Sequence, residues 1–206
     1  SITPCTNPTE TILNNGIGML AAGNTVVFNT HPNAKIVSAW YIDLLNKAIE
    51  DCGGPANVFN CVASPTIESA GDLMKHPLIR LLVVTGGGGV VKAAMASGKR
   101  AIAAGPGNPP VVVDETADIQ AAGRDIVFGA SLDNNIICIV EKEIIVVNEV
   151  ADALKRSMES NHAVELRGRD IKRLEKLLIT DDNHVNRDYI GKDAALILAD
   201  AGIRVP

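Results

Sequence analysis

The sequence predicts an α/β protein built on a Rossmann-like, doubly wound parallel sheet. Short runs of β-branched and other apolar residues alternate with amphipathic segments of roughly ten or more residues, which is the order of strands and helices in such a fold. The short runs are apolar almost throughout, rather than at every second position. Strands of this kind are typical of a parallel sheet that helices cover on both faces, with right-handed crossovers between the strands.

The first 132 residues contain most of these alternating elements. A helix is predicted over 7–23, because Asn7 suits the N-cap, Pro8 the first turn and Gly23 the C-terminal stop. Strands are predicted at 24–29, 57–63, 80–86, 100–105 and 110–114. Further helices are predicted at 34–52, 66–75, 88–98 and 116–133. The expected apolar face of the second helix comprises Ile36, Val37, Trp40, Tyr41, Leu44, Leu45 and Ala48.

After Asp133 the sequence becomes more polar. A strand is predicted at 141–147, followed by helices at 149–161, 168–178 and 193–202. We therefore place a domain boundary here, with residues 1–132 in a first domain and 133–206 in a second. The sequence begins inside an apolar segment and ends where another strand would follow, so we expect a piece of a longer protein.

Composition and charge narrow the function classes. The 206 residues carry a formal net charge of −5 and contain no run of more than two basic residues, which argues against nucleic acid and anionic membranes as partners. No apolar stretch approaches the roughly 20 residues that span a bilayer. The four cysteines form no CxxC pair, as expected of a protein in a reducing cytosol. The four histidines lack metal-ligand spacing, so we expect no metal site.

The stretch VVTGGGGVVKAAM joins a predicted strand to a predicted helix through four glycines, Gly86 to Gly89. Such a loop allows a ligand to approach the backbone, and the free N–H groups of the following helix suit a phosphate. The spacing is neither G-x-G-x-x-G nor that of a P-loop. From spacing alone, a nucleotide site and a tight strand–helix turn remain equally open. A second loop, AAGPGNPP, contains no carboxylate, His or Lys.

Among the cysteines, Cys138 lies between a predicted helix and a predicted strand, at the domain boundary. It could be a small apolar filler or a nucleophile. Cys5 is its rival, because it precedes a helix N-terminus, where a thiolate is favoured. Cys61 is expected in the core and Cys52 at an exposed helix end. Two carboxylates after Cys138, those of Glu141 and Glu143, are interpreted as part of a solvated strand face.

Four segments, in this order and spacing, carry a resemblance to a known family. They are ITPCTNPTETILNNGIGMLAAGNTVVFNTHP, LLVVTGGGGVVKAAM, AIAAGPGNPPVVVDETAD and DNNIICIVEKEIIVV, and the later YIGKDAALILADAGIRVP also matches. Together they resemble the CoA-acylating branch of the aldehyde dehydrogenase superfamily, most of all the propionaldehyde and acetaldehyde dehydrogenases of bacterial microcompartments. The resemblance implies a nucleotide-binding domain over 1–132 and part of a catalytic domain over 133–206, in the aldehyde dehydrogenase fold.

The resemblance also implies roles for individual residues. Cys138 aligns with the catalytic cysteine, and Asn7 with the asparagine whose amide lines the oxyanion hole. The implied cofactor-binding set is Thr6, His31, Pro32, Thr85, Gly86, Gly87 and Gly105. Where many hydrolytic relatives carry Lys-Pro against the adenosine ribose, this sequence has Asn29 in the stretch NTHP, so its adenosine recognition must differ.

A second departure bears on the reaction. Hydrolytic relatives carry Glu-Leu-Gly-Gly, whose Glu activates water, whereas this sequence has Ala104-Gly105-Pro106-Gly107. Ala104 cannot accept a proton, but a thiol such as CoA can still attack a thioester. The resemblance thus implies oxidation of a short-chain aldehyde by NAD, with NADP as the other option, and CoA to an acyl-CoA through a thioester on Cys138.

Three alternatives remain at this point. The chain could be a catalytically inactive nucleotide-binding fragment, a hydrolytic aldehyde dehydrogenase or a non-enzymatic binding module. The resemblance further implies a homo-oligomer for the full-length enzyme, with small aldehydes and CoA as partners and with neither nucleic acid nor membrane. It implies a cytoplasmic location, or one inside a bacterial microcompartment for propanediol or ethanolamine utilisation.

Overall fold

The computed structural model describes residues 1–205 and shows two compact units, unit 1 over residues 1–107 and unit 2 from Asn108 onward. The division falls earlier than the boundary expected after residue 132. The reason is pairing: β5 (Pro110–Val113) pairs in parallel with β6 (Glu143–Val146), and α5 (Ile119–Ser131) packs on α6 (Asn148–Ser160). These contacts join residues 110–131 to the C-terminal part of the chain rather than to the sheet before them.

Unit 1 is a parallel sheet in which the N-terminal segment of the chain is the central strand. The named strands pair as β1 (Val26–Phe28) with β2 (Phe59–Cys61), and β3 (Leu81–Thr85) with β4 (Arg100–Ala104). Ile2 forms parallel bridges to Asn29 and to Val84 and thus joins the two pairs. The chain therefore winds outward from Ile2 in both directions, which is the doubly wound order that the sequence predicts.

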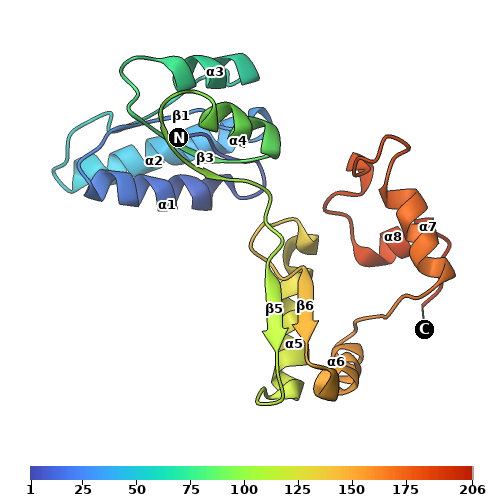
Figure 1. Cartoon of the computed structure of the whole chain (residues 1–206). Coiled ribbons are helices and arrows are strands. Elements are labelled where there is room, and N and C mark those ends of the chain that lie inside the picture. Colours follow the sequence, from blue (N-terminus) through green and yellow to red (C-terminus); the bar gives the residue numbers. More distant parts are fainter. Residues whose placement is uncertain (206) are drawn as a thin grey trace. The chain divides into compact units, whose positions relative to one another are not determined.

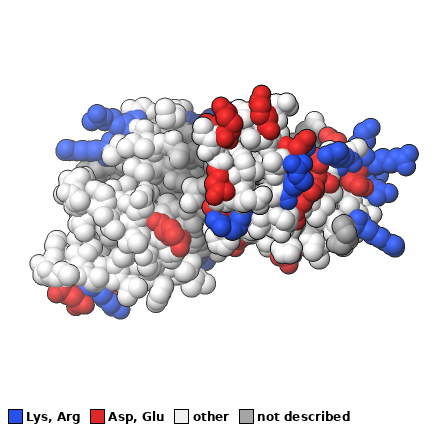
Figure 2. All heavy atoms as spheres, turned by 90° about the horizontal axis from the view of Figure 1, so that it is seen from below, with Lys and Arg blue, Asp and Glu red and all other residues white. Residues whose placement is uncertain are grey.

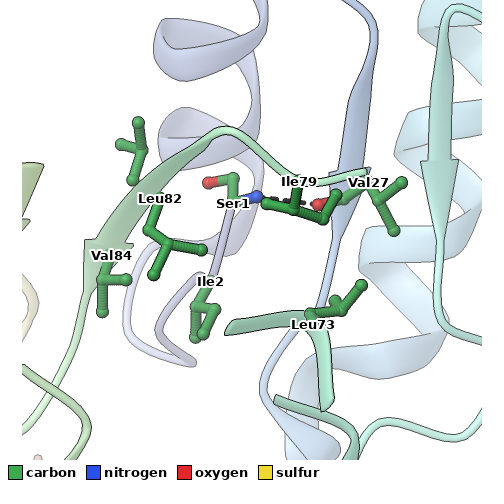
Figure 3. A pocket seen from close by; sticks show the side chains of 8 residues that line it. Ser1, Ile2, Val27, Leu73, Ile79, Leu82 and Val84 are labelled. Carbon is green, nitrogen blue, oxygen red and sulfur yellow. Dashed lines mark hydrogen bonds between the residues drawn. The ribbon is translucent and has the colours of Figure 1, made fainter. Parts of the chain in front are cut away.

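Backbone hydrogen bonds hold this central segment. The Ile2 N–H donates to the Val83 carbonyl at 2.8 Å, and the Thr85 N–H donates to the Ile2 carbonyl at 3.0 Å. The Ser1 amino group donates to the Val27 carbonyl at 2.7 Å, as Figure 3 shows. Burial lowers the pKa of this amino group to about 5. The small cavity beside it, about 10 Å³, has room for roughly one water molecule.

Four helices cover the two faces of the sheet (Figure 1). They are α1 (Pro8–Ala21), α2 (Lys35–Asp51), α3 (Ile67–Lys75) and α4 (Gly88–Met95), and a 3₁₀ turn (Pro32–Ala34) precedes α2. Each face has its own core. The core under α1 and α2 contains Ile12, Val26, Phe28, Ile42, Val58 and Phe59, and the core under α3 and α4 contains Ile2, Ala70, Met74, Leu82, Val84 and Ala94.

The apolar stripe predicted on α2 is only half used. Tyr41 and Leu45 pack against the core, but Trp40 is 61% exposed and Ile36 is 80% exposed. The residues that the helix buries completely are Ser38 and Ile42. The apolar stripe is wider than the core beneath it. The spacing of apolar residues therefore predicted the helix correctly, but not which of its sides faces the core. Charged side chains are sparse on the face of unit 1 that Figure 2 shows.

Unit 2 has a smaller core, formed by Val113, Ile126 and Leu154 with partly buried neighbours. Gly123 allows α5 and α6 to approach closely, because a methyl group added there would lie 2.3 Å from the Ser157 Oγ. The remaining elements are the helices α7 (Arg169–Leu178) and α8 (Ala194–Asp200), a 3₁₀ turn (Arg187–Tyr189) and a tight segment (Leu132–Asn135) that contains left-handed residues. Within residues 1–205 no helix combines the length and apolar character that crossing a bilayer requires.

Candidate functional site

A cavity of about 600 Å³ opens at the carboxyl ends of the parallel strands of unit 1. Its walls come from the end of the central segment, from the turns after β1 and β3, and from α3 and α4. The lining residues are Ile2, Thr3, Pro4, Asn29, Thr30, His31, Pro32, Thr66, Ile67, Ala70, Gly71, Met74, Thr85, Gly86, Gly87, Gly89, Val90 and Ala93. The cavity lies where the winding of the sheet reverses, which is where ligands bind in open α/β sheets.

Backbone conformation does not require glycine at positions 86 to 89, and close packing requires it only at Gly86. None of Gly86 to Gly89 has a positive φ. A methyl group added at Gly87, Gly88 or Gly89 would meet no other atom within 4 Å, whereas one at Gly86 would lie 2.8 Å from Val90. Gly87 and Gly89 line the cavity. Their missing side chains keep the backbone and the first turn of α4 open to a ligand, and this open backbone fits a dinucleotide.

A second helix begins at the cavity. The side chains of Thr66 and Ser69 form a capping box at the start of α3, with Ser69 N–H donating to Thr66 Oγ1 at 3.1 Å. The Ser69 hydroxyl in turn donates to Asn29 Oδ1 at 2.6 Å. Asn29 is 4% exposed and thus joins the end of β1 to α3. Its side chain is engaged within the protein, in contrast to a lysine that reaches a ribose.

The cavity brings together five of the seven residues expected to bind a cofactor. Thr85, Gly86 and Gly87 end β3 and lead into α4, while His31 and Pro32 follow β1. The His31 Nδ1 accepts a hydrogen bond from the Asn33 N–H at 3.2 Å, which fixes the imidazole at the start of the 3₁₀ turn.

Two of the expected residues do not line the cavity. Gly105 is exposed in the loop after β4, and the Thr6 hydroxyl instead donates to Asn7 Oδ1 at 3.1 Å. The residues that sequence reasoning missed lie on α3, such as Ala70 and Met74. A usable signal was present, because the T-x-x-S stretch marks the start of a helix directly after a parallel strand.

Asn7 occupies the N-cap position of α1, but its side chain makes no capping bond. The Asn7 main-chain carbonyl accepts bonds from the Thr11 N–H at 3.1 Å and from the Thr11 hydroxyl at 2.9 Å. In the described part of the chain, the Nδ2 group of Asn7 donates no hydrogen bond. The side-chain amide is thus available as a donor, as an oxyanion hole requires.

The cysteines differ in their surroundings. Cys138 lies in a turn between the tight segment Leu132–Asn135 and β6, and its free thiol is half-buried. Cys61 packs against the core, where burial raises the pKa of its thiol. Cys5 and Cys52 are exposed. Cys138 belongs to unit 2, whereas Asn7 and the cavity belong to unit 1.

Of the two carboxylates expected on a solvated strand face, only that of Glu143 is exposed. Glu143 is exposed, as the solvated strand face requires, but Glu141 is half-buried. The Glu141 carboxylate packs against Gly129 of α5, so closely that a methyl group there would lie 2.0 Å from a carboxylate oxygen. Glu141 precedes β6 (Glu143–Val146), where the chain still runs against the end of α5.

Comparisons with known proteins identify related sequences. The sequence model of the aldehyde dehydrogenase family matches residues 1–170. The chain is 53% identical over 212 aligned residues to acetaldehyde dehydrogenase (acetylating) EutE of Escherichia coli, an alignment that covers 100% of this chain and 45% of EutE. It is 46% identical to propanal dehydrogenase (CoA-propanoylating) of Citrobacter freundii, with 100% of this chain and 44% of that protein covered.

A solved structure extends the comparison to the fold. The propionaldehyde dehydrogenase of Rhodopseudomonas palustris, described with bound CoA and an acylated cysteine, has a TM-score of 0.88 and 47% identity. The match covers 100% of this chain and 47% of that one. The chain thus spans a little under half the length of these relatives. The family match over most of the sequence and the shared fold lead to one conclusion: the chain belongs to the aldehyde dehydrogenase family.

Proposed function

We propose that this chain carries the cofactor cavity and the nucleophile of a CoA-acylating aldehyde dehydrogenase. The observation that carries the proposal is the half-buried free thiol of Cys138, in a turn of a chain that is 47% identical to a relative with an acylated cysteine. Cys61 is occupied with packing, and Cys52 ends a helix remote in sequence from every matching motif. Cys5 is the remaining rival. The segment DNNIICIVEKEIIVV, which resembles the family's catalytic stretch, favours Cys138.

The cavity of unit 1 is the proposed nucleotide site. His31, Pro32, Thr85, Gly86 and Gly87 hold the cofactor there, beside the first turns of α3 and α4. The first turn of α4 has no side-chain cap, so it offers unpaired N–H groups and the positive end of a dipole to a phosphate. NAD+ or NADP+, when bound, accepts the hydride that leaves the substrate. A relative that is an engineered glycolyl-CoA reductase, 45% identical to this chain, is described with bound NADP+.

The chemistry of the chain's own residues follows. The Cys138 thiolate adds to the aldehyde carbonyl and forms a thiohemiacetal with a negatively charged oxygen. The Cys138 backbone N–H stabilises this oxygen, and the resemblance to the family assigns a second donor to the Asn7 side-chain amide. One such donor typically contributes about 3–4 kcal/mol. Loss of hydride from carbon leaves an acyl thioester on Cys138. The CoA thiolate then attacks the thioester carbonyl, and the Cys138 thiolate leaves, so that acyl-CoA forms and the thiol is regenerated.

Ala104 favours CoA over water as the acceptor. It is the last residue of β4, its carbonyl accepts a bond from the Gly86 N–H at 3.1 Å, and its methyl side chain cannot take a proton from water. The loop that follows, Gly105 to Asn108, adds no titratable group. Transfer to a thiol requires a thiolate rather than a base that activates water. Hydrolysis of the thioester is therefore slow in this proposal.

The relatives suggest the remaining features. EutE acts on acetaldehyde and the Citrobacter protein on propanal, so we propose a short-chain aldehyde as substrate. A structure 46% identical to this chain comes from a fucose-utilisation microcompartment of Clostridium phytofermentans. We propose the same setting here, in a cytoplasmic protein that forms a homo-oligomer and binds neither nucleic acid nor membrane.

The test is NADH formation by the enzyme that carries this chain, with propionaldehyde and NAD+, in the presence and absence of CoA. The proposal predicts sustained turnover that requires CoA, with propionyl-CoA as the product. Turnover without CoA, with propionate as the product, would identify a hydrolytic enzyme. Binding of NAD+ without any turnover would identify an inactive nucleotide-binding protein.

A further inference from the structure

The turn that holds Cys138 is closed by one side chain. Residues 132–141 run from the end of α5 to the start of β6, and Asn135 lies near the beginning of this segment. The Asn135 Nδ2 donates to the Ala130 carbonyl at 2.7 Å and to the Glu141 carbonyl at 3.1 Å. A single amide thus joins the last turn of α5 to the residue three positions after the cysteine.

A lysine holds that amide from the other side. The Lys142 ammonium donates to the Asn135 main-chain carbonyl at 2.9 Å and also to Asn135 Oδ1. The Lys142 backbone N–H donates to the Pro109 carbonyl at 3.1 Å, next to the start of β5. Every polar group of the Asn135 side chain is therefore engaged, and the chain of bonds ends on the β5–β6 pair.

The backbone conformation of this segment is unfavourable and requires stabilising contacts. Asp133, Asn134 and Asn135 have φ values of 50°, 51° and 60°, three successive left-handed residues with no glycine among them. Asp and Asn tolerate this conformation better than other L-residues, but it remains unfavourable. Strained backbone persists where surrounding contacts determine it, and such segments cluster at functional sites.

From these contacts we infer that Asn135 is a positioning residue for Cys138. It acts through the turn and not by contact with substrate: its two donated bonds fix both ends of the segment on which the thiol sits, and Lys142 fixes Asn135. The inference rests on the proposed function only in taking Cys138 as the nucleophile. Misplacement of a reacting group by about 1 Å can lower a rate about 100-fold.

The chain offers a matched control in Asn134. This residue is also left-handed, so a glycine relieves the backbone equally at either position. Its amide, however, donates to the Gly191 carbonyl at 3.1 Å and to Asp193 Oδ1 at 2.9 Å, and so does not close the Cys138 turn. The variants are therefore Asn135→Gly and Asn134→Gly. Asn135→Asp is added because it keeps the acceptor for Lys142 and loses both donated bonds.

The experiment measures two quantities in the enzyme that carries this chain: NADH formation from propionaldehyde, NAD+ and CoA, and hydrogen exchange of the amides at 136–140. Both Asn135 variants should lower kcat about 10- to 100-fold and leave the KM for NAD+ within about twofold, because the cavity lies in unit 1. Exchange at 136–140 should rise at least about tenfold. Asn134→Gly should change neither quantity by more than about twofold.

Three results would overturn the inference. One is wild-type exchange at 136–140 in Asn135→Gly, whatever its activity. Another is an equal loss of kcat in Asn134→Gly, and the third is a wild-type kcat in Asn135→Asp. Failure of the proposed function is distinguishable, because the unsubstituted enzyme would then form no NADH, while hydrogen exchange would still decide whether Asn135 closes the turn.

Discussion

The two units hold their site residues by different physical means. Unit 1 forms its cavity from strand ends, the first turns of two helices and a glycine run, next to two apolar cores. Unit 2 presents Cys138 in a turn that side-chain hydrogen bonds close, above a smaller core. This difference implies that cofactor binding and the chemical step of the proposed reaction can be altered separately. Substitutions in the cavity should change binding, and substitutions in the turn should change the chemical step.

The largest expected effect is that of Cys138→Ala, which removes the proposed nucleophile. Acyl-CoA formation should fall at least about 1,000-fold, because no covalent intermediate can form. NAD+ binding, measured by fluorescence titration, should change by less than about twofold, since the cavity lies in unit 1.

The matched control is Cys5→Ala, which removes an exposed thiol from the segment before α1. It should retain at least about half of the activity. If Cys5→Ala instead abolished turnover and Cys138→Ala did not, the nucleophile would belong to unit 1 and the contrast between the units would be wrong.

The glycines of α4 offer a sharper test of unit 1. Gly88 and Gly89 both have open space where a methyl group would lie, but only Gly89 lines the cavity. Either glycine-to-alanine substitution should raise the free energy of unfolding by about 0.5–1 kcal/mol, through helix propensity. Gly89→Ala should also weaken NAD+ binding about tenfold, which corresponds to about 1.4 kcal/mol.

Calorimetric titration and thermal unfolding of both variants check this prediction. Equal NAD+ affinity for Gly88→Ala and Gly89→Ala would show that the ligand does not approach the backbone at this turn.

A third prediction concerns the packing of unit 2. Gly123→Ala places a methyl group 2.5 Å from the Ser157 Cβ and 3.0 Å from its main-chain carbon, so α5 and α6 must separate. The expected cost is about 1–3 kcal/mol of unfolding free energy, measured by urea denaturation. NAD+ affinity should remain unchanged. A loss of affinity equal to the loss of stability would mean that the cavity depends on unit 2.

A last prediction concerns the pH dependence of the stability of unit 1. For a chain with a free amino group at Ser1, burial lowers the pKa of that group from 8.0 to about 5. Between these values the unfolded chain binds a proton that the folded chain does not, so the unfolding free energy rises from pH 5 to pH 8 and is flat above pH 8. The expected rise is at most about 4 kcal/mol, since the pKa falls by about 3 units and 1 pKa unit corresponds to about 1.4 kcal/mol.

Urea unfolding at several pH values measures this dependence. The same measurement on a chain with one extra residue before Ser1 shows how much of it comes from the Ser1 amino group. The extended chain lacks the buried charge and should lose the dependence. Persistence of the rise in the extended chain would assign it to other groups.

Local patterns predicted the elements well because helix and strand signals are local. Pro8 and Gly23 mark the ends of α1, and the apolar run at Leu81–Thr85 forms β3 as expected. The partner of β5 could not be predicted in this way, because the pairing with β6 depends on residues more than 30 positions away. The inward face of α2 was missed for a related reason: its apolar stripe is wider than the core it covers.

Residues of the candidate site could be predicted from the sequence only where they belong to a recognisable pattern. The glycine run forms one, and three of its four glycines line the cavity. His31 and Pro32 followed from the resemblance and also line it. Thr6 and Gly105 followed from the resemblance alone, and neither lines it. The role of Asn135 was invisible in the sequence, because it depends on a left-handed backbone and on bonds to Ala130 and Glu141 that only the folded turn creates.

The most direct test of the account is to trap the acyl group. The enzyme that carries this chain is mixed with propionaldehyde and NAD+ without CoA, quenched in acid and digested, and its cysteine peptides are analysed by mass spectrometry. The account predicts a propionyl group on the peptide that contains Cys138, and its disappearance when CoA is added before the quench. A propionyl group on Cys5 instead, or none on any cysteine while NADH accumulates, would contradict the account.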